Sequence, residues 1–97
     1  MDTTIGVIGL GIMGAAYARN LMGKGFKVIG FDVDTAKIKT LQAEGLQAAT
    51  SPADVGRKCD LVVTSLPTPK AFHAVMSGAN GLTEVGRPIV VADTCTL

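Results

Sequence analysis

The sequence has little of what metal, nucleic-acid or membrane sites need. It contains one histidine and two cysteines, and Cys59 and Cys95 show neither metal-ligand spacing nor a Cys-x-x-Cys motif. These cysteines predict free thiols in a reducing compartment and no metal site. The net charge is +1, and the lysines are scattered singly along the chain. The broad basic surface that binds nucleic acid or a membrane is therefore not expected.

Long hydrophobic runs are also lacking. The apolar runs stop at about six residues, whereas a membrane-spanning helix needs roughly 20. The chain opens with Met1-Asp2, an acidic start rather than the basic start of a secretory signal peptide. The sequence thus predicts a soluble, cytoplasmic protein.

What is present is the composition of one packed domain. Hydrophobic residues make up 47% of the 97 residues and charged residues 18%, which fits a globular core and argues against disorder. The length suits a single domain over residues 1–97.

Apolar runs alternate with amphipathic stretches, which is the pattern of β-α-β units around a parallel sheet. Five strands are predicted, at Ile5–Ile8, Phe26–Phe31, Leu46–Ala49, Leu61–Leu66 and Ile89–Ala92. Right-handed crossovers between them lead to a three-layer α/β fold. This fold is a Rossmann-like, doubly wound parallel sheet in strand order 3-2-1-4-5.

The helices between these strands are predicted from their caps and their apolar faces. Asp34, Ser51 and Thr68 each stand at a helix start, and the last two are followed by a proline, which is favoured in a first helical turn. The first helix, over Gly11–Met22, is expected to turn one apolar face toward the sheet. That face would consist of Met13, Ala16, Tyr17 and Leu21.

Three glycines, Gly9, Gly11 and Gly14, form a G-x-G-x-x-G motif between the first strand and the first helix. The first glycine permits a tight turn, the second leaves room for a pyrophosphate beside the backbone, and the third lets the helix pack closely. The helix N-terminus then offers free N–H groups and a positive dipole end to phosphates. In this strand-to-helix context the motif predicts dinucleotide binding.

Asp32 ends the second predicted strand, about 20 residues after the first glycine, where a ribose-binding acid belongs. A carboxylate there accepts hydrogen bonds from the ribose hydroxyls and repels a 2′-phosphate. The predicted cofactor is therefore NAD rather than NADP. Lys37 lies close enough in the sequence to keep NADP open as the alternative.

Three further segments stay ambiguous from the residues alone. Leu66–Pro69 leaves the fourth strand beside the crevice where open α/β sheets bind ligands, and it either lines the cofactor or merely stiffens a corner. The segment 93–96 follows the fifth strand, and its hydroxyls either reach a ligand or belong to an ordinary turn. His73 has no evident partner to orient it and is interpreted as a half-exposed helix residue rather than a catalytic base.

The stretch Val7–Leu21, VIGLGIMGAAYARNL, resembles the amino-terminal signature of the β-hydroxyacid dehydrogenase family. The Gly-Leu-Gly-x-Met-Gly core is the specific part of that signature. Ser51–Val55, Leu66–Thr68 and Ser77–Gly81 are similar to further segments of the family, most of all in its 3-hydroxyisobutyrate dehydrogenases. The resemblance covers all 97 residues, but family members are substantially longer. We therefore expect a chain truncated relative to the family, without its second, helical domain.

The resemblance implies which residues meet the cofactor and the substrate. NAD contacts are expected at Gly9, Leu10, Gly11, Ile12, Met13, Gly14, Asp32, Leu66, Pro67 and Thr96. The segment 93–96 is similar to the family's Asp-x-Ser-Thr segment, which meets the substrate and the nicotinamide. Cys95 stands at the serine position, as a substrate-binding residue with a poorer hydrogen-bond donor.

The resemblance also implies an activity for the parent protein, namely hydride transfer between NAD and a small 3-hydroxy acid such as 3-hydroxyisobutyrate. The family's catalytic lysine lies well after the nucleotide domain. No lysine here matches it, so no catalytic residue is expected in this chain. The hydroxy-acid substrate would be bound through the missing domain, and no nucleic-acid or membrane partner is expected.

Other functions remain open at this point. Within the family, the alternative is a 2-hydroxy-3-oxopropionate (tartronate semialdehyde) reductase. Outside it, the chain could be a nucleotide-binding module without chemistry of its own, which senses NAD or docks to a partner along an uncovered fifth strand. A homo-oligomer is also open. Related folds bind S-adenosylmethionine beside a similar glycine turn, but Met13-Gly14 argues against that cofactor.

Overall fold

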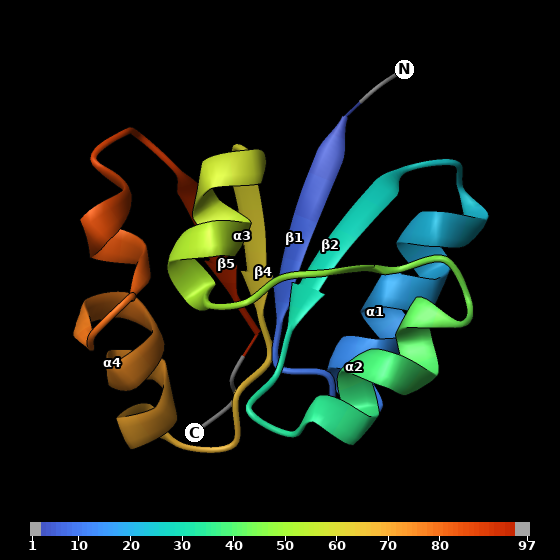
Figure 1. Ribbon diagram of the computed structural model, residues 1–97, viewed down its shortest axis with the longest axis horizontal. Helices are drawn as coiled ribbons and strands as arrows, with labels where there is room; N and C mark the ends of the chain where they lie inside the picture. Colours follow the sequence, from blue (N-terminus) through green and yellow to red (C-terminus); the bar gives the residue numbers. More distant parts are fainter. Residues whose placement is uncertain (1–2, 95–97) are drawn as a thin grey trace.

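The computed structural model describes residues 3–94, which form one parallel sheet between two layers of helices (Figure 1). The strands are β1 (Thr4–Ile8), β2 (Lys27–Phe31), β3 (Gln47–Ala48), β4 (Leu61–Thr64) and β5 (Val90–Asp93). The helices are α1 (Ile12–Gly23), α2 (Thr35–Gln42), α3 (Pro52–Lys58), α4 (Pro69–Ser77) and the 3-10 helix η1 (Leu82–Val85). The sheet order β3-β2-β1-β4-β5, with every pair parallel, confirms the predicted doubly wound fold. In this part of the chain, none of the helices combines the length and the apolar character that a membrane span requires.

Two hydrophobic clusters hold the helices on opposite faces of the sheet. Val7 belongs to one cluster with Ala18 of α1 and Leu41 of α2. Its neighbour Ile8 belongs to the other cluster, with Val55 of α3. Because successive residues of a strand point to opposite faces, a strand covered on both sides needs apolar residues at consecutive positions. The continuous apolar runs of the sequence therefore mark the strands of a three-layer fold.

The predicted helix starts are confirmed by their hydrogen bonds. The Ser51 hydroxyl accepts a bond from the Asp54 N–H at 3.1 Å, and the Asp54 carboxylate reaches back to the Thr50 N–H at 3.0 Å. The Thr68 hydroxyl caps α4, and the Asp34 carboxylate caps α2. Each cap satisfies an N–H group that has no partner within its helix.

The predicted inward face of α1 is wrong for Met13 and Ala16, which are exposed, whereas Tyr17 and Leu21 are partly buried. The residues of α1 that are buried are small: Gly14, Ala15 and Ala18. The first turn of α1 lies so close to the end of β1 that a larger side chain would not fit there. The helix is therefore rotated, and Met13 is turned outward with 56% of its surface exposed.

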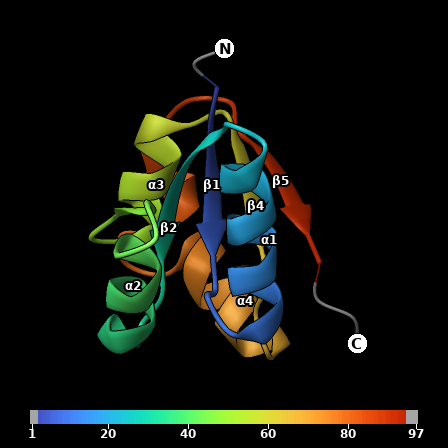
Figure 2. The ribbon, with the colours of Figure 1, turned by 90° about the vertical axis from the view of Figure 1, so that its right-hand side faces the viewer.

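The strand β5 forms one edge of the sheet (Figure 2). Val91 packs against the cluster on the α3 side, but Val90 is 66% exposed and Ala92 is exposed too. In the described residues, one apolar face of this strand is therefore left without a covering helix, as the sequence led us to expect for an edge strand.

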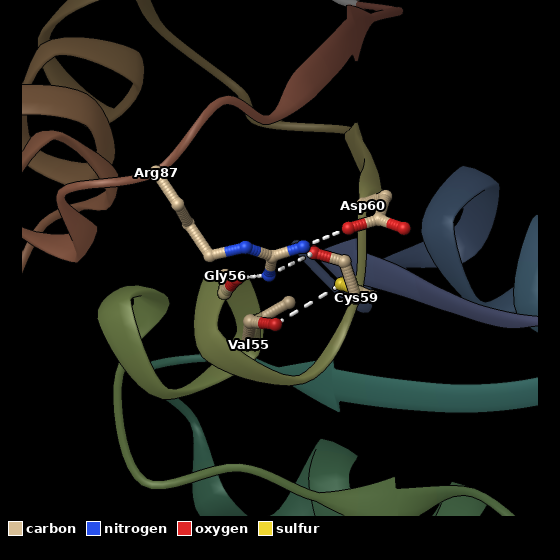
Figure 3. A network of polar contacts seen from close by, with 5 residues as sticks. All are labelled: Val55, Gly56, Cys59, Asp60 and Arg87. Carbon is tan, nitrogen blue, oxygen red and sulfur yellow. Dashed lines mark hydrogen bonds and ion pairs between the residues drawn. The ribbon is translucent and has the colours of Figure 1, made fainter.

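The carboxyl-terminal end of α3 is closed by Arg87, from the segment that leads into β5 (Figure 3). Its guanidinium donates hydrogen bonds to the carbonyl oxygens of Gly56 at 2.8 Å and Cys59 at 3.2 Å, and it pairs with the Asp60 carboxylate. The last carbonyls of a helix lack partners within the helix, and a cation there also suits the helix dipole. Arg87 thus joins α3 to a segment distant in the sequence.

Cys59 lies in the same region as a buried free thiol. Its S–H donates to the Val55 carbonyl oxygen at 3.0 Å (Figure 3), and burial raises the pKa of the thiol above its usual value. Because the thiolate is the reactive form of cysteine, Cys59 behaves as a small core residue rather than a nucleophile. The prediction of a free thiol is confirmed for Cys59, while Cys95 lies outside the described residues.

Replacing Arg87 should cost more stability than replacing its ion-pair partner. We expect Arg87→Gln to lower the free energy of unfolding by about 1 kcal/mol, because carbonyl groups of α3 lose a charged donor. Asp60 is 86% exposed, so Asp60→Asn should change stability by no more than about 0.5 kcal/mol. Urea denaturation of both variants tests this, and an equal loss in the two would contradict the helix-capping role.

Asp54 should make the stability of the fold depend on pH. Its pKa is lowered mainly by the hydrogen bond from the Thr50 N–H, with a further contribution from Lys58. A carboxyl group whose pKa is lower in the folded state stabilises the fold above its unfolded pKa, and this stabilisation is lost as the pH falls. We expect Asp54→Asn to be about 1 kcal/mol less stable than the parent at pH 7. The gap should shrink below about pH 4. Urea denaturation at pH 7 and pH 3 checks this, and a gap independent of pH would exclude it.

Candidate functional site

The register of the parallel sheet brings four strand ends together. Ile8 of β1 pairs with Phe31 of β2 and with Thr64 of β4, which in turn pairs with Asp93 of β5. The residues that follow these four must therefore lie side by side at the carboxyl edge of the sheet. They are Gly9, Asp32, Ser65 and Thr94.

All four of these residues line one groove of about 910 Å³ at that edge. Open parallel sheets bind ligands at this place, where the chain leaves neighbouring strands in opposite directions. The groove is lined further by the glycine loop, by Val33 and Lys37 after β2, by Thr50 and Ser51 before α3, and by Leu66, Pro67, Ala71 and Asn80 on the α4 side.

Two of the three motif glycines are required by the protein's own packing. Gly9 has a φ of +93°, which only glycine adopts readily, and a Cβ there would collide with the Ser65 carbonyl oxygen. A Cβ on Gly14 would collide with the carbonyl oxygen of Gly9. The turn off β1 and the close packing of α1, which the sequence predicted for these two glycines, are confirmed.

Gly11 differs from both, since the protein itself does not need a glycine there. Its φ is −69°, which any residue can adopt, and a Cβ would meet no atom within 4 Å. The space around Gly11 is therefore open, and Gly11 is among the residues that line the groove. The missing side chain therefore leaves room for something other than this chain.

Asp32 stands beside the glycine loop and is partly buried. One carboxylate oxygen accepts a hydrogen bond from the Leu10 N–H at 2.7 Å, and the other accepts one from the Asp34 N–H at 2.8 Å. A carboxylate offers about four acceptor positions, so each oxygen keeps one for a ligand. Asp32 lines the groove and can hydrogen-bond a diol placed there.

The rim of the groove carries large apolar side chains that are exposed. Ile12 is 92% exposed and Val33 is 90% exposed, and Met13 lies beside them. Lys37 is the cation among the lining residues. An apolar rim with a few polar groups is typical of sites that bind flat, partly apolar ligands.

The structure brings most of the predicted contact residues together, but not all. Gly9, Gly11, Ile12, Met13, Asp32, Leu66 and Pro67 line the groove. Leu10 and Gly14 do not: the Leu10 side chain is buried in the core, and Gly14 is packed under the loop. Cys95 and Thr96 lie outside the described residues. His73 is exposed on α4 and is not among the residues that line the groove.

Several lining residues were given no ligand contact from the sequence, among them Ser65 and Asn80. Ser65 follows β4 directly, so the rule that ligands bind at the carboxyl ends of strands could have found it. Asn80 has a positive φ of 59° in the loop after α4. It belongs to Ser77–Gly81, a segment noted for its resemblance to the family but given no contact with a ligand.

Two side-chain hydrogen bonds join the carboxyl ends of β4 and β5 and fix the backbone there. The Thr64 hydroxyl donates to the Asp93 carboxylate at 2.9 Å, and the Thr94 hydroxyl donates to the Thr64 carbonyl oxygen at 2.8 Å. Thr64 is fully buried. These bonds hold Thr94 at the groove, within the segment 93–96 that the resemblance assigns to the substrate and the nicotinamide.

Comparison with known proteins gives a consistent family. A family model of the NAD binding domain of 6-phosphogluconate dehydrogenase matches residues 4–96. Human mitochondrial 3-hydroxyisobutyrate dehydrogenase is 42% identical over 96 residues, which are 98% of this chain and 29% of that protein. L-threonate dehydrogenase of Cupriavidus necator is 36% identical over 88 residues, or 91% of this chain and 30% of that protein.

Among solved structures, 3-hydroxyisobutyrate dehydrogenase of Mycobacterium tuberculosis, determined with L-serine, superposes with a TM-score of 0.80 at 32% identity. The match covers 97% of this chain and 32% of that one. The chain thus spans about 30% of the length of the relatives it matches.

The different tasks of the glycines can be tested without any ligand. Gly11→Ala should leave the free energy of unfolding within about 0.5 kcal/mol of the parent, because the new methyl group meets open space. Gly14→Ala should lower it by about 3 kcal/mol, because a methyl group forced against backbone displaces α1. Thermal unfolding of the two variants measures the contrast. If Gly11→Ala lowered the free energy of unfolding as much as Gly14→Ala, the fold itself would need Gly11.

Proposed function

The chain belongs to the family of the NAD binding domain of 6-phosphogluconate dehydrogenase, and from this we propose that its groove binds NAD in preference to NADP. We further propose that residues 1–97 are the cofactor-binding domain of a 3-hydroxy acid dehydrogenase. The observation that carries the proposal is the open space at Gly11, between two glycines that the packing does require. A pyrophosphate needs such a close approach to backbone.

Each part of the cofactor has candidate partners. The loop from Gly9 to Gly14 would hold the pyrophosphate, at the end of α1 where the N–H groups and the helix dipole favour negative charge. Asp32 would bind the hydroxyls of the adenosine ribose through the acceptor positions that it keeps free. Leu66 and Pro67 would contact the cofactor farther along the groove, and Thr96 is proposed at its nicotinamide end.

The preference for NAD rests on the charge of Asp32. Its carboxylate lies in the groove where the ribose 2′ position is proposed, and it would repel a phosphate there. Lys37 also lines the groove and is the group that could favour NADP. Because Asp32 is held by two backbone N–H groups, it cannot move away without losing them. The negative charge should therefore dominate.

The proposed reaction of the parent protein is the reversible oxidation of a small 3-hydroxy acid. The bound nicotinamide would accept or return the hydride, while the proton would be moved by a group outside this chain. Support comes from the human and mycobacterial relatives, both named 3-hydroxyisobutyrate dehydrogenases, and from the L-serine in the mycobacterial structure, itself a 3-hydroxy acid. Cys95 is proposed to contact the substrate beyond the carboxyl end of β5.

The relatives' names limit how far the substrate can be specified. One relative acts on L-threonate and another on 3-hydroxyisobutyrate by name, so one type of cofactor domain serves several acids. The proposed choice of 3-hydroxyisobutyrate rests on the higher identity to the human enzyme. The cytoplasmic location stays a prediction, and the human relative is named as mitochondrial.

Calorimetric titration of the 97-residue chain with NAD and with NADP tests the proposal. We expect saturable binding of NAD, tighter than that of NADP by roughly tenfold or more. Gly11→Val should weaken NAD binding by at least about 100-fold, since its side chain would fill the space kept for the pyrophosphate. The stability of this variant, measured in parallel, separates a blocked groove from a damaged fold. Unchanged NAD affinity in a folded Gly11→Val chain would refute the proposed site.

A further inference from the structure

We propose that Asp32 is a positioning residue for the glycine loop, in addition to any contact with ribose. In this view its carboxylate holds the Leu10 N–H and thereby fixes the loop with the space at Gly11 open, before a cofactor arrives. The consequence for binding rests on the proposed function. The effect of Asp32 on the loop is independent of that function and can be measured in the cofactor-free chain.

The contact that carries this inference joins two segments that are distant in the sequence. Leu10 sits between the first two motif glycines, and its N–H donates to Asp32 at 2.7 Å. Hydrogen bonds to a charged acceptor are stronger than those between neutral groups. The other oxygen of Asp32 is held by the Asp34 N–H at 2.8 Å. The carboxylate is therefore fixed from both sides and can act as a rigid support.

The loop needs such a support because glycine is flexible. Gly9 and Gly11 lose more conformational freedom on folding than other residues would. The loop is anchored at its start by the Gly9 N–H, which donates to the Phe31 carbonyl oxygen at 2.9 Å, and at its end by the Ala15 N–H, which donates to Gly11. The bond from Leu10 to Asp32 lies between these anchors, where the chain turns toward the open space.

The side chain of Leu10 also holds the loop in place, because it is packed in the core. It is only 3% exposed and belongs to the hydrophobic cluster beneath α1 and α2. The backbone of Leu10 is therefore held from below by packing and from the side by the carboxylate. Its N–H is used within the protein, whereas the first N–H groups of α1 have no partners within their helix and could meet a phosphate.

The two roles of Asp32 predict opposite effects of removing its carboxylate on the affinity for a diphosphate that lacks ribose hydroxyls. If the carboxylate only hydrogen-bonds the ribose hydroxyls, removing its negative charge should strengthen the binding of an anion in the groove. If the carboxylate also fixes the loop, its removal should weaken binding even when there are no hydroxyls to read. ADP and 2′,3′-dideoxy-ADP supply the matched pair of probes.

The first experiment follows hydrogen exchange of the Leu10 amide by NMR in the cofactor-free chain. Asp32→Ala should speed that exchange by about tenfold or more, while the strand amides of Val7 and Val28 keep their protection. Asp32→Asn retains an oxygen that can accept from Leu10, and it should restore most of the protection. Unchanged exchange at Leu10 in Asp32→Ala would overturn the proposal.

The second experiment measures the affinity of both probes for the parent chain and for Asp32→Ala. We expect 2′,3′-dideoxy-ADP to bind roughly tenfold more weakly to Asp32→Ala than to the parent, with ADP losing more again because its hydroxyls also lose a partner. Asp32→Asn should recover part of the dideoxy-ADP affinity. Asp60→Asn removes the same charge away from the groove and serves as the control, with no change expected.

The outcomes separate this proposal from the function on which its second part rests. Equal or tighter binding of dideoxy-ADP by Asp32→Ala would show that the carboxylate only reads ribose, and would overturn the positioning role. If the parent chain bound neither NAD nor ADP, the proposed function would fall. The exchange rate at Leu10 would still decide whether Asp32 fixes the loop.

Discussion

The contact of three backbone segments at the end of β1 constrains the rest of the structure. The chain turns at Gly9 directly against the Ser65 carbonyl oxygen, and α1 returns so closely that Gly14 touches the carbonyl group of Gly9. No side chain fits between these segments. The close approach sets where α1 starts, and so which of its residues face the sheet. It also places the free N–H groups of its first turn at the carboxyl edge, next to the ends of β2 and β4.

The groove stands out because some of its residues do not serve the stability of the fold. Gly11 gives up a side chain that the packing would tolerate, and Ile12 and Val33 expose nearly all of their apolar surface. Elsewhere, apart from Val90 on the edge strand, the described chain packs most of its large apolar residues into two clusters. Proteins depart from such local consistency mainly where a ligand completes the arrangement. A dinucleotide supplies both the phosphates for the free N–H groups and the flat rings for the apolar rim.

The sequence predicted the fold well because its signals are local and agree with one another. Apolar runs gave the strands, and caps at Asp34, Ser51 and Thr68 gave three helix starts. The face of α1 could not be predicted in this way, because periodicity ranks large apolar residues as inward. The close backbone contact admits only small ones there. At Met13 the close packing of α1 against β1 outweighs the periodicity, so this residue is exposed and lines the groove.

The sequence predicted those groove residues whose type and spacing are characteristic of a dinucleotide site. The glycines and the acid after β2 are recognised by their spacing, and Leu66 and Pro67 by the strand that they follow. The bond between Leu10 and Asp32 has no signal of its own, since it depends on the parallel register of β1 with β2. Asn80 lies in a segment that the resemblance noted, but its place at the groove depends on how the loop after α4 folds, which hydrophobic periodicity does not predict.

The direction of the groove bears on where the rest of the proposed enzyme must act. Adenosine at Asp32 would place the cofactor's other half across the glycine loop, toward Leu66 and Thr94. Hydride transfer requires contact between the nicotinamide and the substrate carbon, so the substrate would sit beyond β4 and β5. The apolar face of β5, where Val90 and Ala92 are exposed, lies open at this edge of the described sheet. In the proposed enzyme, a domain that supplies the proton-transferring group would therefore approach from this side. In the proposed enzyme, this chain would fix the position of the cofactor, and whatever covers the nicotinamide end would select among hydroxy acids.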